Sequence, residues 1–358
     1  MSTTLHAPTT SVVRTAPAQT TKQRDPWFDN AKMLLVTLVV LGHSWTLLPE
    51  TALNTWVYNF LYLWHVPAFV MVTGYLSRSF TWKRTSMSRL LTTVALPYVV
   101  FEAALAAFRV GVGGEDLDLL FADPHWPMWY LSALFLWRLV TPVFKAAPAA
   151  LALAVGVSLL GGLTTGDVLD VARAMGLLPF FVVGLLARPE HLALLRRPAA
   201  RLAAGATMAL AFALTFFVEG RMGTEWLYWR ASYGELHATF LEGAGARIAL
   251  LLLCGLVAVS FFALVPQRGG WFSRMGAATL VVYLFHGFVI KGVEYTNVPD
   301  WASAHPVLGL ALVSPLAVVL ALLLGWPPVA TRLNVLVDPV GALRRLRARR
   351  AAPEQASS

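Results

Sequence analysis

The sequence predicts an all-α fold, a polytopic membrane helix bundle of about ten transmembrane helices with both termini in the cytoplasm. Three observations predict it: the apolar composition, ten apolar stretches, and an alternation of basic and acidic loops. Of the 358 residues, 57% are hydrophobic and only 13% are charged, and the mean hydropathy is +0.63. Because a soluble domain carries roughly 25% charged residues, this chain is too poor in polar residues to cover a soluble globule.

Ten segments of the sequence approach the length of about 20 mostly apolar residues that a transmembrane helix needs. In order they are Ala31–Leu48, Trp56–Leu76, Leu90–Val110, Pro127–Phe144, Ala147–Leu163, Val171–Ala187, Ala199–Val218, Ala246–Val265, Arg274–Lys291 and Pro306–Trp326. The fifth and sixth are short. We expect a disordered cytoplasmic tail at 1–24, a membrane domain at 25–335, and a basic cytoplasmic tail at 336–358.

The charges of the loops predict the orientation. Alternate loops and the C-terminal tail are basic, whereas the remaining loops are poorer in Lys and Arg and carry acidic residues. Under the positive-inside rule this pattern puts both termini in the cytoplasm and favours an even number of spans. The net charge of +9 therefore reflects topology, and we expect no nucleic-acid partner. The Ala, Leu and Arg bias suggests a GC-rich bacterium, so the expected location is the bacterial cytoplasmic membrane.

Several ionisable side chains fall within the predicted spans. A charged side chain there costs about 2.5–3.5 kcal/mol on insertion scales, so these residues are candidates for function and are expected to face the bundle interior. They are His43, His65, Glu102, Arg138, Arg173 and His286. The three histidines and the carboxylate reach similar depths on separate helices, which permits a shared pocket.

The first predicted helix carries a polar pair, Lys32 and His43. Eleven residues at 100° per residue bring the two side chains within about 20° of one face, and the helical rise separates them by about 16 Å. Lys32 is expected at the cytoplasmic edge, and His43 is expected beyond the midplane.

This set of residues suits general base catalysis. A neutral imidazole is the usual base near neutral pH, and Glu102 is a candidate to orient it and to stabilise its protonated form. Trp129, Tyr130 or a second histidine are candidates to donate hydrogen bonds to an anionic intermediate. Alternatively, each histidine makes only an interhelical hydrogen bond. We expect no metal, since no HExxH or Glu-x-x-His spacing occurs and the single cysteine, Cys254, offers no cysteine-based site.

Two further features of the sequence bear on function. It has no GxSxG nucleophile elbow, and no histidine is followed by an aspartate five residues later, so a soluble-type acyltransferase site is not supported. The largest predicted external loop, 219–245, contains Trp226, Tyr228, Trp229 and Tyr233. These rings either stack on sugar faces or form an aromatic belt at the membrane interface.

Ordered motifs along the chain resemble those of the integral-membrane acyltransferase family, type 3, and most closely its fucose 4-O-acetylase-like branch. The first helix opens with Arg24-Asp25-Pro26-Trp27-Phe28-Asp29-Asn30-Ala31-Lys32 and ends near Leu41-Gly42-His43-Ser44. The other motifs are His65-Val66-Pro67-Ala68-Phe69 with Thr73-Gly74-Tyr75-Leu76, Trp129-Tyr130-Leu131, Leu178-Pro179-Phe180-Phe181 with Gly184, and Gly276, Thr279-Leu280 and Tyr283-Leu284-Phe285-His286. Each motif is weak alone, but their order over nearly the whole chain is specific.

The resemblance implies about ten helices, an acyl-CoA donor such as acetyl-CoA, and O-acylation of a carbohydrate or lipid-linked glycan, with His43 as the base. Some relatives acylate macrolides or other small molecules, which leaves the acceptor open. Many members of the family carry the motif Arg-x-x-Arg before the third helix, where it is thought to serve the donor. In this sequence Arg84 and Arg89 are five residues apart, so that motif is not reproduced. Lys32, Arg84 and Arg89 are expected either to neutralise CoA phosphates or to be positive-inside anchors.

Two other functions remain open from sequence. Polar residues near the midplane also suit a transporter or flippase for a glycan or small molecule, although the internal repeat of many transporters is missing. A membrane scaffold or sensor without catalysis is the third alternative.

Overall fold

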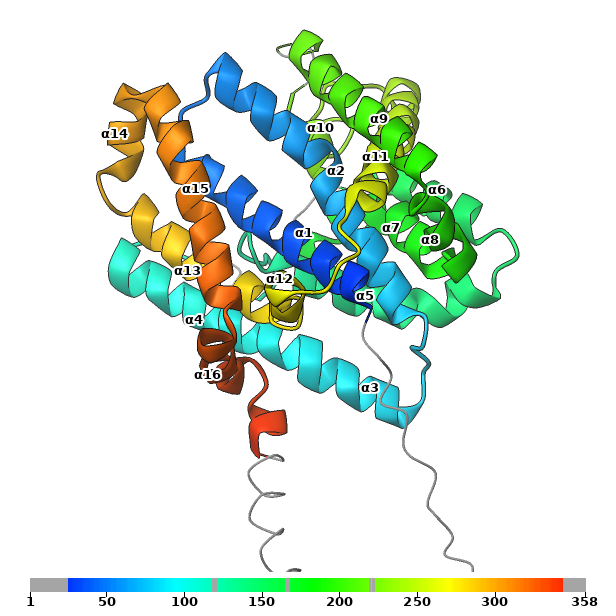
Figure 1. The fold of residues 1–358 in the computed structure, drawn as a ribbon, viewed down its shortest axis with the longest axis horizontal. Coiled ribbons are helices and arrows are strands. Elements are labelled where there is room, and N and C mark those ends of the chain that lie inside the picture. The colour runs from blue at the N-terminus through cyan, green and yellow to red at the C-terminus, as the bar shows by residue number, and fades with distance from the viewer. Residues whose placement is uncertain (1–24, 118–120, 165–167, 219, 221–222, 344–358) are drawn as a thin grey trace, which may run out of the picture.

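The protein is described by a computed structural model over residues 25–117, 121–164, 168–218, 220 and 223–343, and in this part of the chain it is helical without strands (Figure 1). The predicted tail at 1–24 and residues 344–358 of the predicted basic tail lie outside it. The elements are α1 Pro26–Ser44, η1 Trp45–Leu47, α2 Ala52–Ser77, α3 Arg84–Leu90, η2 Leu91–Ala95, α4 Leu96–Gly113, α5 Trp129–Ala146, α6 Ala150–Gly161, η3 Val168–Asp170, α7 Val171–Leu186, α8 Pro189–Leu195, α9 Pro198–Phe217, α10 Glu225–Tyr228, α11 Phe240–Leu264, α12 Trp271–Met275, α13 Thr279–Glu294, α14 Val298–Ala304, α15 Pro306–Gly325 and α16 Pro327–Val337.

Each of the ten predicted apolar segments overlaps a helix, and the all-α fold is confirmed. By length and composition, six helices of the described chain can cross a membrane: α2, the α3–α4 helix, η3–α7, α9, α11 and α15. The segment expected at Ala147–Leu163 forms only the 12-residue α6, which is roughly 18 Å long against an apolar core of about 30 Å. The count of ten spans and the cytoplasmic position of the termini therefore stay predictions.

The outer surface of the bundle is apolar, as a lipid-facing surface must be. Large aliphatic side chains project outward from the long helices without protein around them. Leu202 on α9, Leu241 and Leu252 on α11, and Leu316 on α15 are each 65% to 81% exposed. Because water would penalise so much exposed apolar surface, the structure describes a multi-pass membrane protein.

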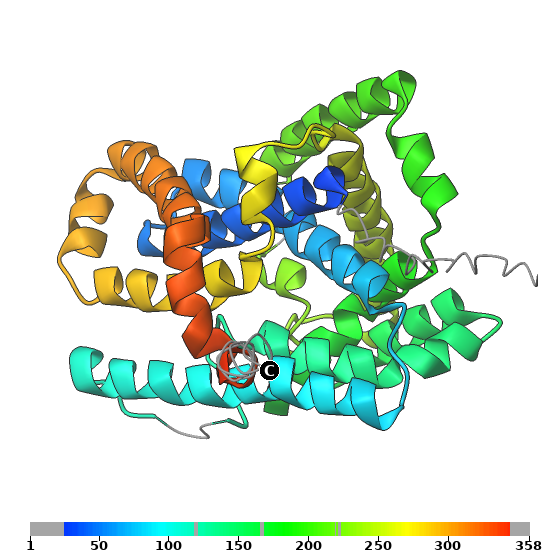
Figure 2. The ribbon, with the colours of Figure 1, turned by 60° about the horizontal axis from the view of Figure 1, so that its bottom comes forward.

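Helix α1 lies at the centre of the bundle and packs against α2, α12, α13 and α15 (Figures 1 and 2). It begins at Pro26, five residues before the predicted start, because the Asp25 side chain caps it by accepting a hydrogen bond from the Trp27 amide at 3.0 Å and Pro is suited to the first helical position. Because other helices surround α1, a residue at the end of this helix, such as His43, can lie inside the bundle.

One long helix, Arg84–Gly113, runs along one side of the bundle (Figures 1 and 2). It joins α3, a π-helical turn at Leu91–Ala95, and α4. We expected Arg84 and Arg89 in a basic loop before the predicted span Leu90–Val110; that expectation is wrong, since both residues belong to the helix itself. The π turn directly precedes Pro97. Because proline lacks an amide hydrogen and crowds the preceding turn, a locally wider turn lets the helix continue.

Helices α2 and α7 cross at very close range. A side chain on Gly74 of α2 would collide with the backbone of Phe181, and one on Gly184 of α7 would collide with the backbone of Met71. Small residues allow two membrane helices to approach in this way. The glycines of two separate sequence motifs thus meet at one crossing.

Candidate active site

The centre of the candidate site is a pair of histidines. His43 lies near the end of α1, and His286 lies near the middle of α13. The distance from His43 Nδ1 to His286 Nε2 is 2.8 Å, and the rings lie nearly parallel with their centroids 5.0 Å apart. His286 is completely buried. The structure therefore joins two of the four predicted catalytic residues in one hydrogen bond.

The backbone around α13 fixes which nitrogen carries each proton. His286 Nδ1 lies 3.2 Å from the carbonyl oxygen of Val282, and since a carbonyl can only accept, His286 Nδ1 is the donor. In the neutral ring Nε2 is then an acceptor, so His43 Nδ1–H donates to it. His43 Nε2 is left with a lone pair, which is the state that a general base needs.

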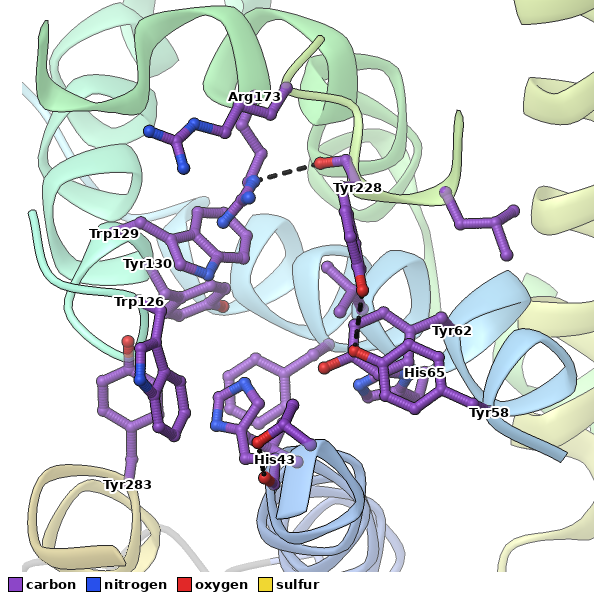
Figure 3. Close-up of a pocket in the computed structure, with 16 residues that line it drawn as sticks. His43, Tyr58, Tyr62, His65, Trp126, Trp129, Tyr130, Arg173, Tyr228 and Tyr283 are labelled. Atoms are coloured by element: carbon purple, nitrogen blue, oxygen red, sulfur yellow. Dashed lines mark hydrogen bonds between the residues drawn. The ribbon is translucent and has the colours of Figure 1, made fainter. Parts of the chain in front are cut away.

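His43 opens onto a cavity of about 260 Å³ (Figure 3). Aromatic side chains form much of its wall. Its lining residues are Val39, His43, Thr46, Tyr58, Tyr62, His65, Val66, Phe69, Trp126, Trp129, Tyr130, Arg173, Leu227, Tyr228, Arg230 and Tyr283. A small, mostly apolar cavity with a few polar groups is typical of a ligand site. We call it the His43 cavity.

Three other predicted site residues line the His43 cavity. They are His65, Trp129 and Tyr130. His65 Nδ1–H donates to the carbonyl of Leu61 at 2.7 Å, which leaves its Nε2 as an acceptor. The Tyr130 hydroxyl is hydrogen-bonded to Thr73, so two predicted motif residues hold each other in place.

The cation of Arg173, also a candidate from the sequence, completes the wall. Arg173 Nε donates to the carbonyl of Tyr228 at 3.0 Å, and its guanidinium lies 4.6 Å from the centre of a Trp129 ring. Its Nη1 is 3.6 Å from a carboxylate oxygen of Asp170. Asp170 has a φ of 51°, an uncommon value for a residue with a side chain, and such strain often occurs at functional sites.

Glu102 lies in a different place from the histidine pair. It makes no hydrogen bond to either histidine within the described chain, and its Oε1 instead accepts the backbone N–H of His125 at 3.0 Å. It lines a second cavity, also of about 260 Å³, which shares Trp126, Arg173 and Arg230 with the first. The predicted contact between Glu102 and a histidine base is therefore absent from this arrangement.

The three cations predicted to contact the donor do not line the His43 cavity. Lys32 forms an ion pair with Asp29 at 2.8 Å, three residues earlier on α1. Arg84 and Arg89 are exposed on α3. The structure thus separates these cations from the histidines, as expected for residues at a different depth.

The aromatic residues of the predicted external loop are largely inside the protein. Trp229 and Tyr233 are 1% and 2% exposed, and Tyr228 lines the His43 cavity, where its hydroxyl lies 3.0 Å from that of Tyr58. The buried pair forms neither an exposed sugar-stacking face nor an interfacial belt, because the segment folds back and Tyr233 bonds to the carbonyl of Leu159 at 3.0 Å.

Sequence reasoning missed several wall residues. Trp126 lies edge-on to the His43 ring, with centroids 4.4 Å apart. It precedes the predicted helix Pro127–Phe144, so helical periodicity could not place it on a face. Tyr58 and Tyr62 were available from periodicity, because with His65 they recur at intervals of four and three residues on α2, which places them on one helix face.

Comparisons with known proteins are consistent with this geometry. Residues 25–326 match the family described as an acyltransferase domain, type 3. Nodulation protein NolL of Sinorhizobium fredii (strain NBRC 101917 / NGR234) is 32% identical over 140 residues, which cover 34% of this chain and 37% of NolL. The match therefore spans little more than a third of that relative. No solved structure matches the chain significantly.

Proposed function

The chain belongs to the type 3 acyltransferase domain family, and from this premise we propose that it is a membrane O-acyltransferase. It moves an acyl group, in the simplest case acetyl, from acyl-CoA to a hydroxyl of a carbohydrate or glycan, in the bacterial cytoplasmic membrane. The observation that carries the proposal is His43, whose Nδ1 is held by His286 at 2.8 Å while its Nε2 makes no hydrogen bond with the described residues beside the cavity.

The proposed reaction is direct acyl transfer. The acceptor hydroxyl oxygen attacks the thioester carbonyl carbon while His43 Nε2 takes the hydroxyl proton. A carbon–oxygen bond forms, and the carbonyl electrons move to oxygen to give a tetrahedral anion. When that anion collapses, the carbon–sulfur bond breaks, and the proton on His43 passes to the departing CoA sulfur. No net proton is gained or lost, and His43 returns to its starting form.

The His43 cavity carries donors for the anionic intermediate. Arg173 is a fixed positive charge in its wall, and the indole N–H of Trp129 is a second donor there. Donors held in advance around a developing oxyanion are often the largest contribution to catalysis, because they need no rearrangement during the reaction. Arg173 is held by both Tyr228 and Asp170, which limits its movement.

The donor is proposed to approach from the end of α1 that carries Lys32. His43 lies about 16 Å further along the helix by its rise. The exposed cations Arg84 and Arg89 are suited to the phosphates of acyl-CoA, because a guanidinium group can bind a phosphate through two hydrogen bonds. Membership of the fucose 4-O-acetylase-like branch remains part of this proposal, as does the sugar acceptor.

The test is transfer of labelled acetyl from acetyl-CoA to extracted cell-envelope glycans by the purified protein. We expect His43→Ala to lower transfer by about 10²–10⁴-fold, which is the usual contribution of a general base. His191→Ala is the matched control, because His191 is exposed on α8. Full transfer by a correctly inserted His43→Ala protein would contradict the proposal, and glycan movement without consumption of acetyl-CoA would favour a transporter.

A further inference from the structure

A second, polar cavity adjoins the His43 cavity. Its volume is about 260 Å³, and its walls come from α4, α7 and the described residues that connect α4 to α5. Its lining residues are Glu102, Arg109, Asp116, Leu117, Asp123, Pro124, His125, Trp126, Asp170, Arg173 and Arg230. We call it the polar cavity. Trp126, Arg173 and Arg230 belong to the walls of both cavities, so a ligand in one is next to the other.

Two buried polar atoms at the polar cavity, Glu102 Oε2 and His125 Nε2, have no hydrogen-bond partner among the described residues. Glu102 is only 2% exposed, and its Oε2 makes no hydrogen bond with the described residues. The same holds for Nε2 of His125. Burial, and next the positive charges of Arg109 and Lys291, lower the pKa of His125 to about 3, so its ring is neutral at physiological pH. Because an unsatisfied buried polar group costs about 1–3 kcal/mol, both atoms are suited to bind a ligand.

The charges in the polar cavity select against a charged ligand. Arg230 contacts Asp123 at 3.3 Å and Asp170 at 3.4 Å, so carboxylates and guanidinium groups alternate around the wall. An anion would meet Glu102 and Asp123, and a cation would meet Arg173 and Arg230. A hydroxyl both donates and accepts hydrogen bonds, and therefore matches such a mixed wall.

The wall shared by the two cavities includes an aromatic ring. The Trp126 ring centroid is 4.4 Å from that of His43 and 5.8 Å from that of His125. An indole offers a flat apolar face, which suits the C–H face of a sugar ring. A ring held against Trp126 would have one edge toward Glu102 and His125 and another toward the base.

We propose that the polar cavity binds one neutral, polyhydroxylated ring of the acceptor and presents a hydroxyl past Trp126 to His43. In this arrangement Glu102 and Asp123 accept hydrogen bonds from hydroxyls of the ring. His125 Nε2 makes a further bond, and Glu102 acts in acceptor recognition and not in proton transfer. This inference rests on the proposed acyl transfer and deepens it by assigning the subsite of the acceptor ring and the absence of charge on that ring.

The test separates acceptor binding from donor use. With purified protein in detergent, labelled acetyl transfer is measured at varied glycan concentration and then at varied acetyl-CoA concentration. We expect Glu102→Gln and Asp123→Asn each to raise the half-saturating glycan concentration about tenfold, the effect of losing one hydrogen bond to a charged group. The half-saturating acetyl-CoA concentration should not change.

Glu190→Gln is the matched control, because Glu190 is exposed on α8 away from both cavities. An unchanged glycan requirement in both cavity variants, or a change in the acetyl-CoA requirement instead, would overturn the assignment. That result differs from failure of the proposed function, in which His43→Ala would retain transfer.

A competition experiment tests whether the polar cavity prefers an uncharged sugar ring. Methyl glycosides of glucose, galactose and fucose are compared as inhibitors of glycan acetylation with the methyl glycosides of glucuronic and galacturonic acid. The neutral members should inhibit more strongly. Equal or stronger inhibition by the uronic acids would overturn the preference for an uncharged ring.

Discussion

Replacing His286 tests the chemistry of the histidine pair more sharply than replacing His43. His286 Nε2 is the acceptor that holds His43 Nδ1–H at 2.8 Å. Glutamine can place an amide oxygen near the position of Nε2, whereas the shorter asparagine reaches only about as far as Nδ1. His286→Gln should therefore keep the bond to His43, and His286→Asn should lose it while retaining an amide of the same chemistry.

The size of the effect follows from what His43 loses. Without an acceptor, its Nδ1–H is unsatisfied in a buried site, and nothing selects the tautomer with a free Nε2. A hydrogen bond to a group that becomes charged is worth about 1.5–3 kcal/mol. If that contribution is lost in the transition state, kcat falls about 10- to 150-fold, since each 1.36 kcal/mol is a factor of ten. We expect this loss for His286→Asn and less than a tenfold loss for His286→Gln.

The assay is the initial rate of labelled acetyl transfer to cell-envelope glycans at saturating acetyl-CoA, with thermal unfolding in detergent as the stability control. A purely structural histidine would change unfolding but would not distinguish kcat between the two amides. Equal kcat values for the glutamine and asparagine variants of equal stability would refute the assignment of His286 as the group that orients His43.

Two further predictions concern stability. Although burial opposes it, hydrogen bonds from Tyr295, Arg109 and Lys291 lower the pKa of Glu115 to about 2. A lowered folded-state pKa stabilises the protein above the unfolded value, and that stabilisation is lost as pH falls from about 4.5 towards 2. Glu115→Gln should thus cost up to about 1 kcal/mol at pH 7, after allowing for solvent screening, and less at pH 3. If Glu115→Gln lowers the thermal stability equally at pH 7 and at pH 3, the stabilisation does not come from the lowered pKa of Glu115. Gly74→Ala should cost about 1–3 kcal/mol through overpacking, whereas Gly205→Ala, which meets no neighbour within 4 Å, should be neutral or stabilising in the same melts.

Hydrophobic length was the most informative sequence signal for the fold. Each of the ten apolar segments overlaps a helix, because the chain must satisfy its backbone hydrogen bonds within each segment in an apolar environment. Hydropathy did not predict where the third helix begins. The segment that begins at Arg84 is polar, which is typical of a loop. It nevertheless continues the helix, because exposed polar side chains such as Arg84 and Arg89 do not disturb a helical backbone.

The candidate site was predicted in part, because sequence gives the depth of a residue along a helix but not the direction in which that helix faces. His43, His65 and His286 meet at or beside one cavity. Glu102 was placed at a similar depth, but α4 turns it toward a different cavity. Trp126 and Arg230 could not be found from periodicity, since tertiary folding of connecting segments brings them to the site.

The partner of His43 has a consequence for the proposed reaction. The sequence offered the Glu102 carboxylate as a candidate for the orienting role, as in many soluble enzymes, whereas the structure supplies the neutral ring of His286. A carboxylate beside the base would hold the proton on His43 by charge attraction, and it would also have to be buried in an apolar bundle at a cost. A neutral imidazole still fixes the tautomer of His43. It leaves the proton easier to release, and in direct acyl transfer the same proton must pass within one turnover to the departing sulfur.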